Sequence, residues 1–198
     1  RSYSTKQCLV YKVNEALMQD MEIMPLFSGR WSDNESWEFF ATSKLPPFNL
    51  CTAVFCLPFQ TKQILLVEHS RRGWEIPGGH IEKNEHNILI TLERELFEEA
   101  KVSIVNQTLI GYKKITAAIP QKNEQNNDYY PHPISYIPFY MAQISALHEF
   151  PDQNEIKQRN LYSKEKAISI LYRDSNHQIV ELAYSMLGAQ NRSDIGLL

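Results

Sequence analysis

The chain has 198 residues, a net charge of −3, a hydrophobic share of 43% and a charged share of 22%. These values are ordinary for a globular protein, and the length allows one well-buried domain with accessory segments rather than two full domains. The negative charge argues against a binder of nucleic-acid polymers, although a local basic pocket for phosphates stays open. No apolar run is long enough to cross a bilayer and the first residues lack a signal-peptide pattern, so no membrane partner is expected.

The three cysteines, Cys8, Cys51 and Cys56, form no C-x-x-C motif. If Cys51 and Cys56 share one strand, their odd separation points their side chains to opposite faces, where they cannot easily bridge. We expect free, buried thiols in a reducing environment, and therefore a cytoplasmic protein.

The first 48 residues are predicted to be a helical extension. Apolar residues recur with helical spacing over residues 6–24, and Pro25 would end that helix. The run Ser32–Glu35 has the form of a capping box and would open a second helix, whose apolar side consists of Trp37, Phe40 and Ala41. Pro46-Pro47 would end it, which divides the chain into an extension, residues 1–48, and a main domain, residues 49–198.

The pattern becomes β-like from Leu50 onward. Cys51–Leu57 and Lys62–Glu68 are predicted strands joined by a polar turn, and the run Ile64–Val67 is apolar on both faces, as a covered central strand would be. Two further strands, Ser103–Val105 and Thr108–Thr116, are expected around a turn at residues 106–107.

The last third of the chain combines a loop, a strand and two helices. Residues 120–133 are predicted to be a loop, and Ile134–Ile144 a strand in which Pro138 suggests an edge position or a bulge. Helices are expected at Ser163–Tyr172 and at Ser175–Leu187, the second with Gly188 as its stop. Strands on both sides of a central helix, followed by C-terminal helices, predict an α/β fold with a mixed sheet between helices.

The stretch Trp74–Val102 carries the densest chemistry, W-E-I-P-G-G-H-I-E-K-N-E-H-N-I-L-I-T-L-E-R-E-L-F-E-E-A-K-V. Its second half predicts a helix with Glu95, Glu98 and Glu99 on one face, because these residues stand at i, i+3 and i+4. Three like charges repel one another, and Arg94 alone cannot offset them. A divalent cation would explain the cluster, and oxygen ligands without Cys or His suit magnesium or manganese. The alternative is a solvated acidic helix behind a Gly-Gly turn.

This stretch resembles the Nudix box, G-x5-E-x7-R-E-U-x-E-E-x-G-U, in which U is a bulky apolar residue. The matching positions are Gly79, Glu85, Arg94, Glu95, Leu96, Glu98, Glu99 and Val102. Eight residues rather than seven separate Glu85 from Arg94; His86 is interpreted as the extra one, and Asn87 as the helix N-cap. Lys101 replaces the final glycine, so either a left-handed turn is strained there or the helix exits differently.

The resemblance covers roughly residues 49–187 and implies a Nudix-type α/β/α sandwich. It also implies hydrolysis of a nucleoside diphosphate linked to another group X, with Mg²⁺ as the cofactor and Mn²⁺ as its alternative. By transfer from the motif, Glu95 and Glu99 would be metal ligands together with the carbonyl of Gly78, and Glu98 a ligand or a water-positioning group. Arg94 would orient these carboxylates, and Glu85 would support the loop.

The remaining site assignments are weaker. Arg71 and Arg72 would meet phosphate or remain solvated, and four aromatic residues would stack on a base or simply pack: Trp74, Tyr129, Tyr130 and Phe139. Glu155 is the expected general base or extra metal ligand, ahead of Glu149 and Asp152; otherwise it is a solvated loop carboxylate, and the base is a box glutamate such as Glu98.

Three functions stay open. The first is cleavage of a nucleoside triphosphate, oxidised ones included, to a nucleoside monophosphate and pyrophosphate. The second is hydrolysis of an NDP-sugar or of ADP-ribose, and the third is a non-catalytic Nudix-like module that binds nucleotides. The apolar stripe of the extension must pack on something, so it is expected to form a homodimer interface or to cover one side of the substrate pocket.

Overall fold

The computed structural model describes residues 24–123, 128–150, 155–172 and 175–193. The helix predicted over residues 6–24 lies outside this part of the chain except for its last residue, Met24, which is not helical. Cys8 lies outside it as well. None of the described helices is long and apolar enough to cross a membrane.

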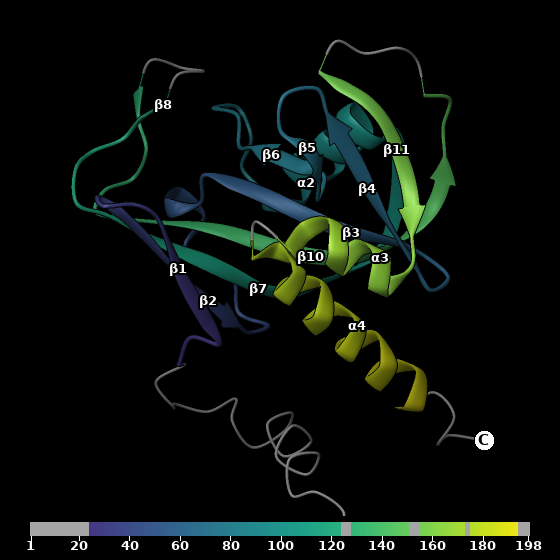
Figure 1. The fold of residues 1–198 in the computed structure, drawn as a ribbon. Helices are drawn as coiled ribbons and strands as arrows, with labels where there is room; N and C mark the ends of the chain where they lie inside the picture. The colour runs from purple at the N-terminus through teal and green to yellow at the C-terminus, as the bar shows by residue number, and fades with distance from the viewer. Residues whose placement is uncertain (1–23, 124–127, 151–154, 173–174, 194–198) are drawn as a thin grey trace, which may run out of the picture.

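A nine-stranded mixed sheet forms the centre of the molecule (Figure 1), in the order β1-β2-β7-β10-β3-β4-β11 with two short strands attached. Its long strands are β1 (Phe27–Ser32), β2 (Glu35–Ala41), β3 (Ala53–Gln60), β4 (Gln63–His69), β7 (Val102–Ala117), β10 (Ile134–Leu147) and β11 (Ile156–Tyr162). The short ones are β5 (Gly73–Glu75), paired with β4, and β6 (Gly78–His80), paired with β3. Strands β10 and β3 pair in parallel, whereas the other neighbours are antiparallel.

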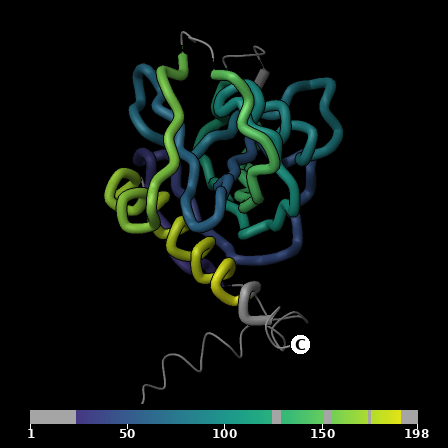
Figure 2. The backbone as a smooth tube through the Cα atoms, turned by 90° about the vertical axis from the view of Figure 1, so that its right-hand side faces the viewer, coloured from purple at the N-terminus to yellow at the C-terminus, as the bar shows by residue number. Residues whose placement is uncertain are grey.

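Helices cover both faces of this sheet, which confirms the predicted α/β/α sandwich. Helices α3 (Lys164–Leu171) and α4 (Asn176–Ser193) cover one face, and α2 (Ile88–Glu95) covers the other. Strand β3 shows why both faces are apolar, because Phe55 and Leu57 pack toward α3 and α4 while Val54 and Cys56 pack toward α2. Figure 2, turned by 90°, shows α4 running diagonally toward the C-terminal end.

The run Ile64–Val67 in β4 is fully buried, as its two apolar faces predicted. Cys51 and Cys56 are free and buried, also as predicted. The expectation that they point to opposite faces is wrong, since both belong to the core beneath α2. The parity argument failed because β3 begins only at Ala53, so Cys51 lies outside the regular alternation.

The second helix predicted for the extension is wrong, because this segment is a β-hairpin. Strands β1 and β2 pair across the turn at residues 33–34, and β2 pairs with β7, so the hairpin belongs to the central sheet. The Oγ of Ser32 accepts a hydrogen bond from the Asn34 N–H at 3.2 Å, a contact within the turn rather than a helix cap. Trp37 and Phe39 are both buried, which is the period of two that marks a strand. The division at residue 48 stays a prediction.

Two strands predicted after the acidic helix are one continuous strand, β7. Asn106 takes a left-handed conformation (φ 57°), and the pairing with β10 shifts register between Met141 and Gln143, so the expected turn is a bulge. Pro138 is not at a sheet edge, because β10 lies between β7 and β3. A register shift does follow it, between Phe139 and Tyr140.

The segment predicted to be a loop at residues 120–133 contains two short paired strands, β8 (Lys122–Asn123) and β9 (Asp128–Tyr129). A single 3-10 turn, η1 (Phe48–Leu50), precedes β3. Helix α3 matches its prediction, with the Ser163 hydroxyl as its N-cap. Helix α4 does not stop at Gly188 but continues to Ser193.

Candidate active site

The acidic segment forms α2 and continues into one π-helical turn, η2 (Leu96–Ala100). The Oδ1 of Asn87 accepts a hydrogen bond from the Leu89 N–H at 2.9 Å, so the predicted N-cap is confirmed. Ile88, Leu92 and Leu96 are buried against the sheet and fix the rotation of the helix. This rotation directs Glu95 and Glu99 toward β6.

The helix ends in a left-handed turn at Lys101, with φ 49° and ψ 48°. The Lys101 N–H donates to the Leu96 carbonyl, which closes the turn that a glycine usually makes. Of the two outcomes considered for this position, the strained turn is the one found.

Arg94 links four acidic or carbonyl groups through its guanidinium group. Its Nε donates to Glu85 Oε1 at 2.8 Å and its second terminal nitrogen to the His80 carbonyl at 2.9 Å. The first terminal nitrogen donates to Glu95 at 2.9 Å and to Glu98 at 3.0 Å. Arg94 thereby ties the loop before α2 to two of the three box carboxylates.

Glu85 anchors the loop between β6 and α2. Its side chain is only 5% exposed and accepts hydrogen bonds from Arg94, from the Thr91 hydroxyl at 2.7 Å and from the Glu82 N–H at 2.8 Å. Burial disfavours the charged form, but these hydrogen bonds outweigh it and lower the pKa of Glu85 to about 2. Glu85 is therefore ionised, and it connects the loop residue Glu82 to Thr91 and Arg94 of α2.

The Gly78-Gly79 pair lets the backbone approach the acidic helix closely. Gly78 has a φ of +146°, and a Cβ there would lie 2.2 Å from the Val54 carbonyl oxygen. A Cβ on Gly79 would lie 2.5 Å from the carboxylate carbon of Glu95. The Gly78 N–H also donates to Glu99 Oε2 at 2.9 Å. Residue 78 must therefore be glycine to fit against β3, and residue 79 must be glycine to leave room for the Glu95 carboxylate.

Burial makes two of the glutamates reluctant to ionise. It raises the pKa of Glu99 to about 7, although the Gly78 N–H opposes the shift, and nearby Glu95 and Glu75 add to it. Burial likewise raises the pKa of Glu95, against the opposing charge of Arg94. Such carboxylates gain most from a bound cation, because the cation would compensate charge that the protein itself does not.

The donor set suits a hard divalent cation in kind, since it offers carboxylate and carbonyl oxygens. It is not a preformed cage: among the described residues, no three acidic, histidine or cysteine side chains converge closely enough to hold a metal. Glu95 and Glu98 are bound to Arg94, and Glu99 is bound to Gly78. Each of these contacts uses one carboxylate oxygen, so a cation would have to bind through the other oxygens and bring the side chains closer together.

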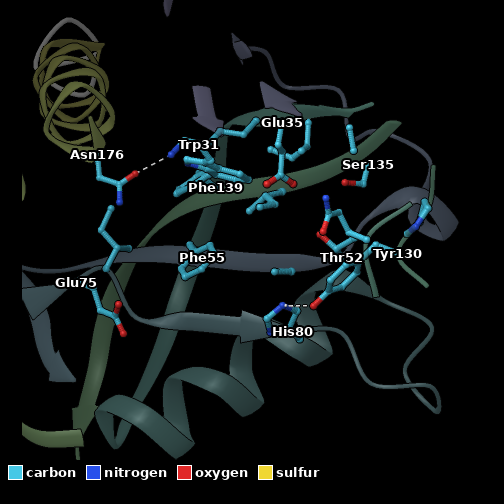
Figure 3. A pocket seen from close by; sticks show the side chains of 18 residues that line it. Trp31, Glu35, Thr52, Phe55, Glu75, His80, Tyr130, Ser135, Phe139 and Asn176 are labelled. Carbon is cyan, nitrogen blue, oxygen red and sulfur yellow. Dashed lines mark hydrogen bonds between the residues drawn. The ribbon is translucent and has the colours of Figure 1, made fainter. Parts of the chain in front are cut away.

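A cavity of about 380 Å³ opens beside β6 on the face of the sheet that carries α3 and α4 (Figure 3). Four aromatic side chains supply much of its lining: Trp31, Phe55, Tyr130 and Phe139. Glu75 and His80 line the side toward the acidic helix. His80 follows Gly79 directly, and its carbonyl accepts from Arg94. The cavity and the acidic helix therefore meet at β6.

Sequence reasoning missed several residues of this cavity, above all Lys113. Lys113 is 4% exposed, its Nζ donates to Asn176 Oδ1 at 2.9 Å, and it lies 4.7 Å from the centre of the Trp37 ring. The alternation of Lys113, Ile115 and Ala117 along β7 places all three on the cavity side. This alternation was the sequence signal that could have placed Lys113 on the same face as Ile115 and Ala117. No sequence pattern could bring Trp31 and Asn176 to the same cavity.

Of the four aromatic residues considered for base stacking, Tyr130 and Phe139 line the cavity. The Tyr130 hydroxyl lies 2.9 Å from His80 Nε2, and the two rings are stacked. Trp74 lies elsewhere, with its ring edge-on to Tyr162 at 5.1 Å. Tyr129 is 62% exposed and does not line the cavity.

The two arginines of the turn before β5 differ in their surroundings. Both are exposed, but Arg72 also forms a two-pronged ion pair with Glu75 at 2.7 and 2.9 Å. The hydrogen bond to Glu75, with the charges of Glu75, Glu99 and Glu155 added, raises the pKa of Arg72. Arg72 is thus the arginine that lies within the electrostatic reach of the acidic helix.

Glu155 lies immediately before β11 and is exposed. Its carbonyl accepts a hydrogen bond from the Ser70 N–H at 2.7 Å, which attaches this segment to the turn that carries Arg72. Glu149 is also exposed, and Asp152 lies outside the described residues. The charge of Glu155 contributes to the raised pKa of Arg72.

Comparisons with known proteins identify the family and the fold. The family model for the NUDIX domain matches residues 49–182. A putative NUDIX hydrolase from Listeria monocytogenes is 18% identical with a TM-score of 0.55, over 70% of this chain and 95% of that one. The Bacillus subtilis pyrophosphohydrolase BsRppH is 20% identical with a TM-score of 0.52, over 69% of this chain and 77% of that one.

A C. elegans Ap4A hydrolase is 16% identical with a TM-score of 0.50, over 69% of this chain and 98% of that one. At these identities, the solved structures show a common fold. A search among curated proteins found no match to the chain.

Proposed function

The chain belongs to the NUDIX hydrolase family, and from this premise we propose that it hydrolyses a nucleoside triphosphate, oxidised ones included, to a nucleoside monophosphate and pyrophosphate with Mg²⁺ as cofactor. Water attacks one phosphorus atom of the anhydride, one P–O bond forms and another breaks, and pyrophosphate leaves. A cluster of carboxylates next to a nucleotide-sized aromatic cavity is the arrangement that this reaction needs.

The observation that carries the proposal is the meeting of the acidic helix with the cavity at β6. Glu75 and His80 line the cavity, while Glu99 and Glu95 contact the adjacent Gly78 and Gly79. A base in the cavity would therefore extend its phosphates toward the carboxylates.

Glu95 and Glu99 would hold the cation together with the Gly78 carbonyl, and Glu98 would join them as a further ligand. When bound, a divalent cation neutralises charge on the phosphate oxygens and so stabilises the transition state. The role of Arg94 in this proposal is to orient Glu95 and Glu98 through the hydrogen bonds described above. Glu85 holds Arg94 in place.

The proton of the attacking water goes to Glu155 in this proposal. The support is positional, because Glu155 shares the surroundings of Arg72 with Glu75 and Glu99. Arg72 would contact a phosphate once it leaves Glu75, and Arg71 would add charge at the rim. Tyr130 and Phe139 supply faces for a base, whereas Trp74 packs away from the cavity.

The test is a hydrolysis screen of the purified full chain with Mg²⁺ and with Mn²⁺, with products identified. The panel holds nucleoside triphosphates, their oxidised forms, NDP-sugars, ADP-ribose and dinucleoside polyphosphates. Release of pyrophosphate and a nucleoside monophosphate supports the proposal, and preferential cleavage of NDP-sugars or ADP-ribose replaces its substrate class. Tight nucleotide binding without turnover would identify a binding module.

Glu155→Gln tests the general base separately from the substrate. Its kcat should fall by about 10²–10⁴-fold with little change in KM, as expected for a group that acts in the transition state. The control is Glu149→Gln, because Glu149 is an exposed carboxylate just after β10. If Glu155→Gln keeps a normal kcat across pH, the role passes to Glu98.

Cytoplasmic location and homodimerisation remain predictions. The buried free thiols Cys51 and Cys56 support a reducing compartment. Sedimentation at several concentrations would establish the oligomeric state.

A further inference from the structure

The helix that carries the box glutamates ends without the glycine that such a turn prefers. Lys101 takes its left-handed conformation, directly after Ala100, the last residue of η2. The final carbonyl groups of a helix have no partner within the helix, and they create a negative potential at its end. Glu98 and Glu99 lie in that last turn, so their charges are disfavoured there.

One guanidinium group, that of Arg159 in β11, binds these carbonyl groups. Arg159 donates to the Ala100 carbonyl, to the Lys101 carbonyl at 2.6 Å and to the His148 carbonyl at 2.6 Å. Its guanidinium carbon lies 5.2 Å from the centre of the Phe150 ring, which limits its freedom. It thus joins three segments: the end of η2, the start of β7 and the chain that leaves β10.

We propose that Arg159 is a positioning residue that holds the Lys101 turn and thereby aims Glu99 at the Gly78-Gly79 strand. Three features of Arg159 support this role. Its charge offsets the potential of the helix end, and one terminal nitrogen donates to two adjacent carbonyls while the other donates to the His148 carbonyl. It also binds the carbonyl of the strained residue itself. Its effect on turnover rests on the proposed function, whereas its effect on the helix end does not.

Glu155, the proposed base, lies immediately before the same strand, four residues before Arg159. Strand β11 pairs with β4, and the Glu155 carbonyl accepts from Ser70. Arg159 therefore connects the segment of the proposed base to the end of the helix that carries the proposed metal ligands. Without Arg159, the segment of Glu155 should be held less firmly relative to the end of the acidic helix.

The experiment compares Arg159→Met, Lys101→Gly and the double variant in the full chain. The matched control is Lys157→Met, which removes a charge from an exposed position on the same strand. Binding of Mn²⁺ alone is measured by calorimetry, next to kcat, KM and Tm. Arg159→Met should weaken Mn²⁺ binding by about 10-fold, the range seen when groups that orient metal ligands are removed, and should lower kcat more than it raises KM.

Lys101→Gly should rescue these losses, because glycine adopts the left-handed turn without help. The double variant should then bind Mn²⁺ within about threefold of the Lys101→Gly parent, a non-additivity that a purely local packing effect would not produce. Arg159→Lys should lie between the wild type and Arg159→Met, since lysine keeps the charge and loses the fork.

Several outcomes would overturn the proposal. A lower Tm with unchanged Mn²⁺ affinity and kcat in Arg159→Met would make Arg159 merely structural, and strict additivity with Lys101→Gly would remove the turn from the explanation. If Arg159→Met does not fold, Arg159→Lys is measured instead, and wild-type Mn²⁺ affinity there overturns the idea. A wild-type chain that neither binds Mn²⁺ nor hydrolyses any nucleotide would instead reject the proposed function.

Discussion

Glu99 is the residue at which stability and catalysis are expected to oppose each other. Its pKa in the folded, metal-free protein is about 7, against an ordinary value of 4.5. Between these two pH values the folded protein keeps a proton that the unfolded chain releases. The free energy of unfolding of the metal-free protein should therefore fall as the pH rises through this window.

Replacing Glu99 with glutamine should remove this fall in the free energy of unfolding. At pH 8, metal-free Glu99→Gln should be more stable than the wild type by on the order of 1–2 kcal/mol, with little difference at pH 4.5. Hydrolysis at saturating Mg²⁺ should fall about 100-fold or more, because a metal ligand is lost, and Glu95→Gln should behave alike. Thermal melts with and without chelator, next to initial rates, measure both effects. Full activity in either variant would reject the proposed metal site.

Glu85 has the opposite pH dependence. Its folded-state pKa of about 2 lies below the ordinary value of 4.5, so its contribution to stability is complete above pH 4.5 and is lost as the pH falls toward 2. Glu85→Gln should lower stability at pH 7 by about 2–3 kcal/mol, because it leaves Arg94 without its buried partner. In urea titrations at several pH values, the free energy of unfolding of the variant should also fall less steeply between pH 4.5 and pH 2 than that of the wild type. An equally steep fall would mean that another carboxylate causes the acid destabilisation.

Helix α4 shows where the sequence misleads at the scale of an element. Gly188 is a good C-terminal signal, yet the helix runs through it to Ser193. Among the described residues, no atom outside the surrounding turn of the helix lies within 4 Å of a Cβ added there. Gly188→Ala should therefore stabilise the protein by up to about 1 kcal/mol, which raises Tm by roughly 2–4 °C, without altering kcat or KM. An unchanged or lower Tm would indicate that the helix frays before this position.

The box helix was predictable because its signals are local. An Asn cap, an apolar face and glutamates at helical spacing all lie within one stretch of chain, so its start and its acidic face were both predicted. The β1–β2 hairpin was not, because S-D-N-E serves equally as a capping box and as a hairpin turn. The alternation of Trp37 and Phe39 favoured the strand, but Phe40 and Ala41 also satisfy a helical spacing from Trp37.

The residues of the cavity were harder to predict from the sequence than those of the acidic helix, because they come from distant parts of the chain. The lining comes from segments between β1 and the start of α4 that include β2, β3, β5, β6, β7 and β10, many of which are distant in sequence. Such a set is fixed by strand order, and a local pattern does not encode strand order. Lys113 in particular looks like an ordinary surface lysine until β7 is placed between β2 and β10.

For the molecule as a whole, the hairpin should be essential to folding. Deleting residues 1–45 removes Trp37 and Phe39 from the core and exposes the edge of β7, a loss of several kcal/mol by the usual cost of large buried aromatics. We expect aggregation or a Tm lower by more than 10 °C, on the order set by that loss. Removing residues 1–23 is the control, because it keeps the described hairpin whole. Equal melting of the two truncations would show that the hairpin is dispensable.

The hairpin also contributes Trp31 and Glu35 to the wall of the cavity, whereas the acidic helix lies on the other face of the sheet. Part of the cavity wall thus comes from residues that precede those matched by the family model, whereas the box carboxylates lie within the matched residues. Under the proposed function, mutations in the hairpin are expected to change which nucleotide is preferred without touching the carboxylates. In directed evolution, a library confined to residues 27–35 is expected to sample new selectivities while it keeps the box helix intact.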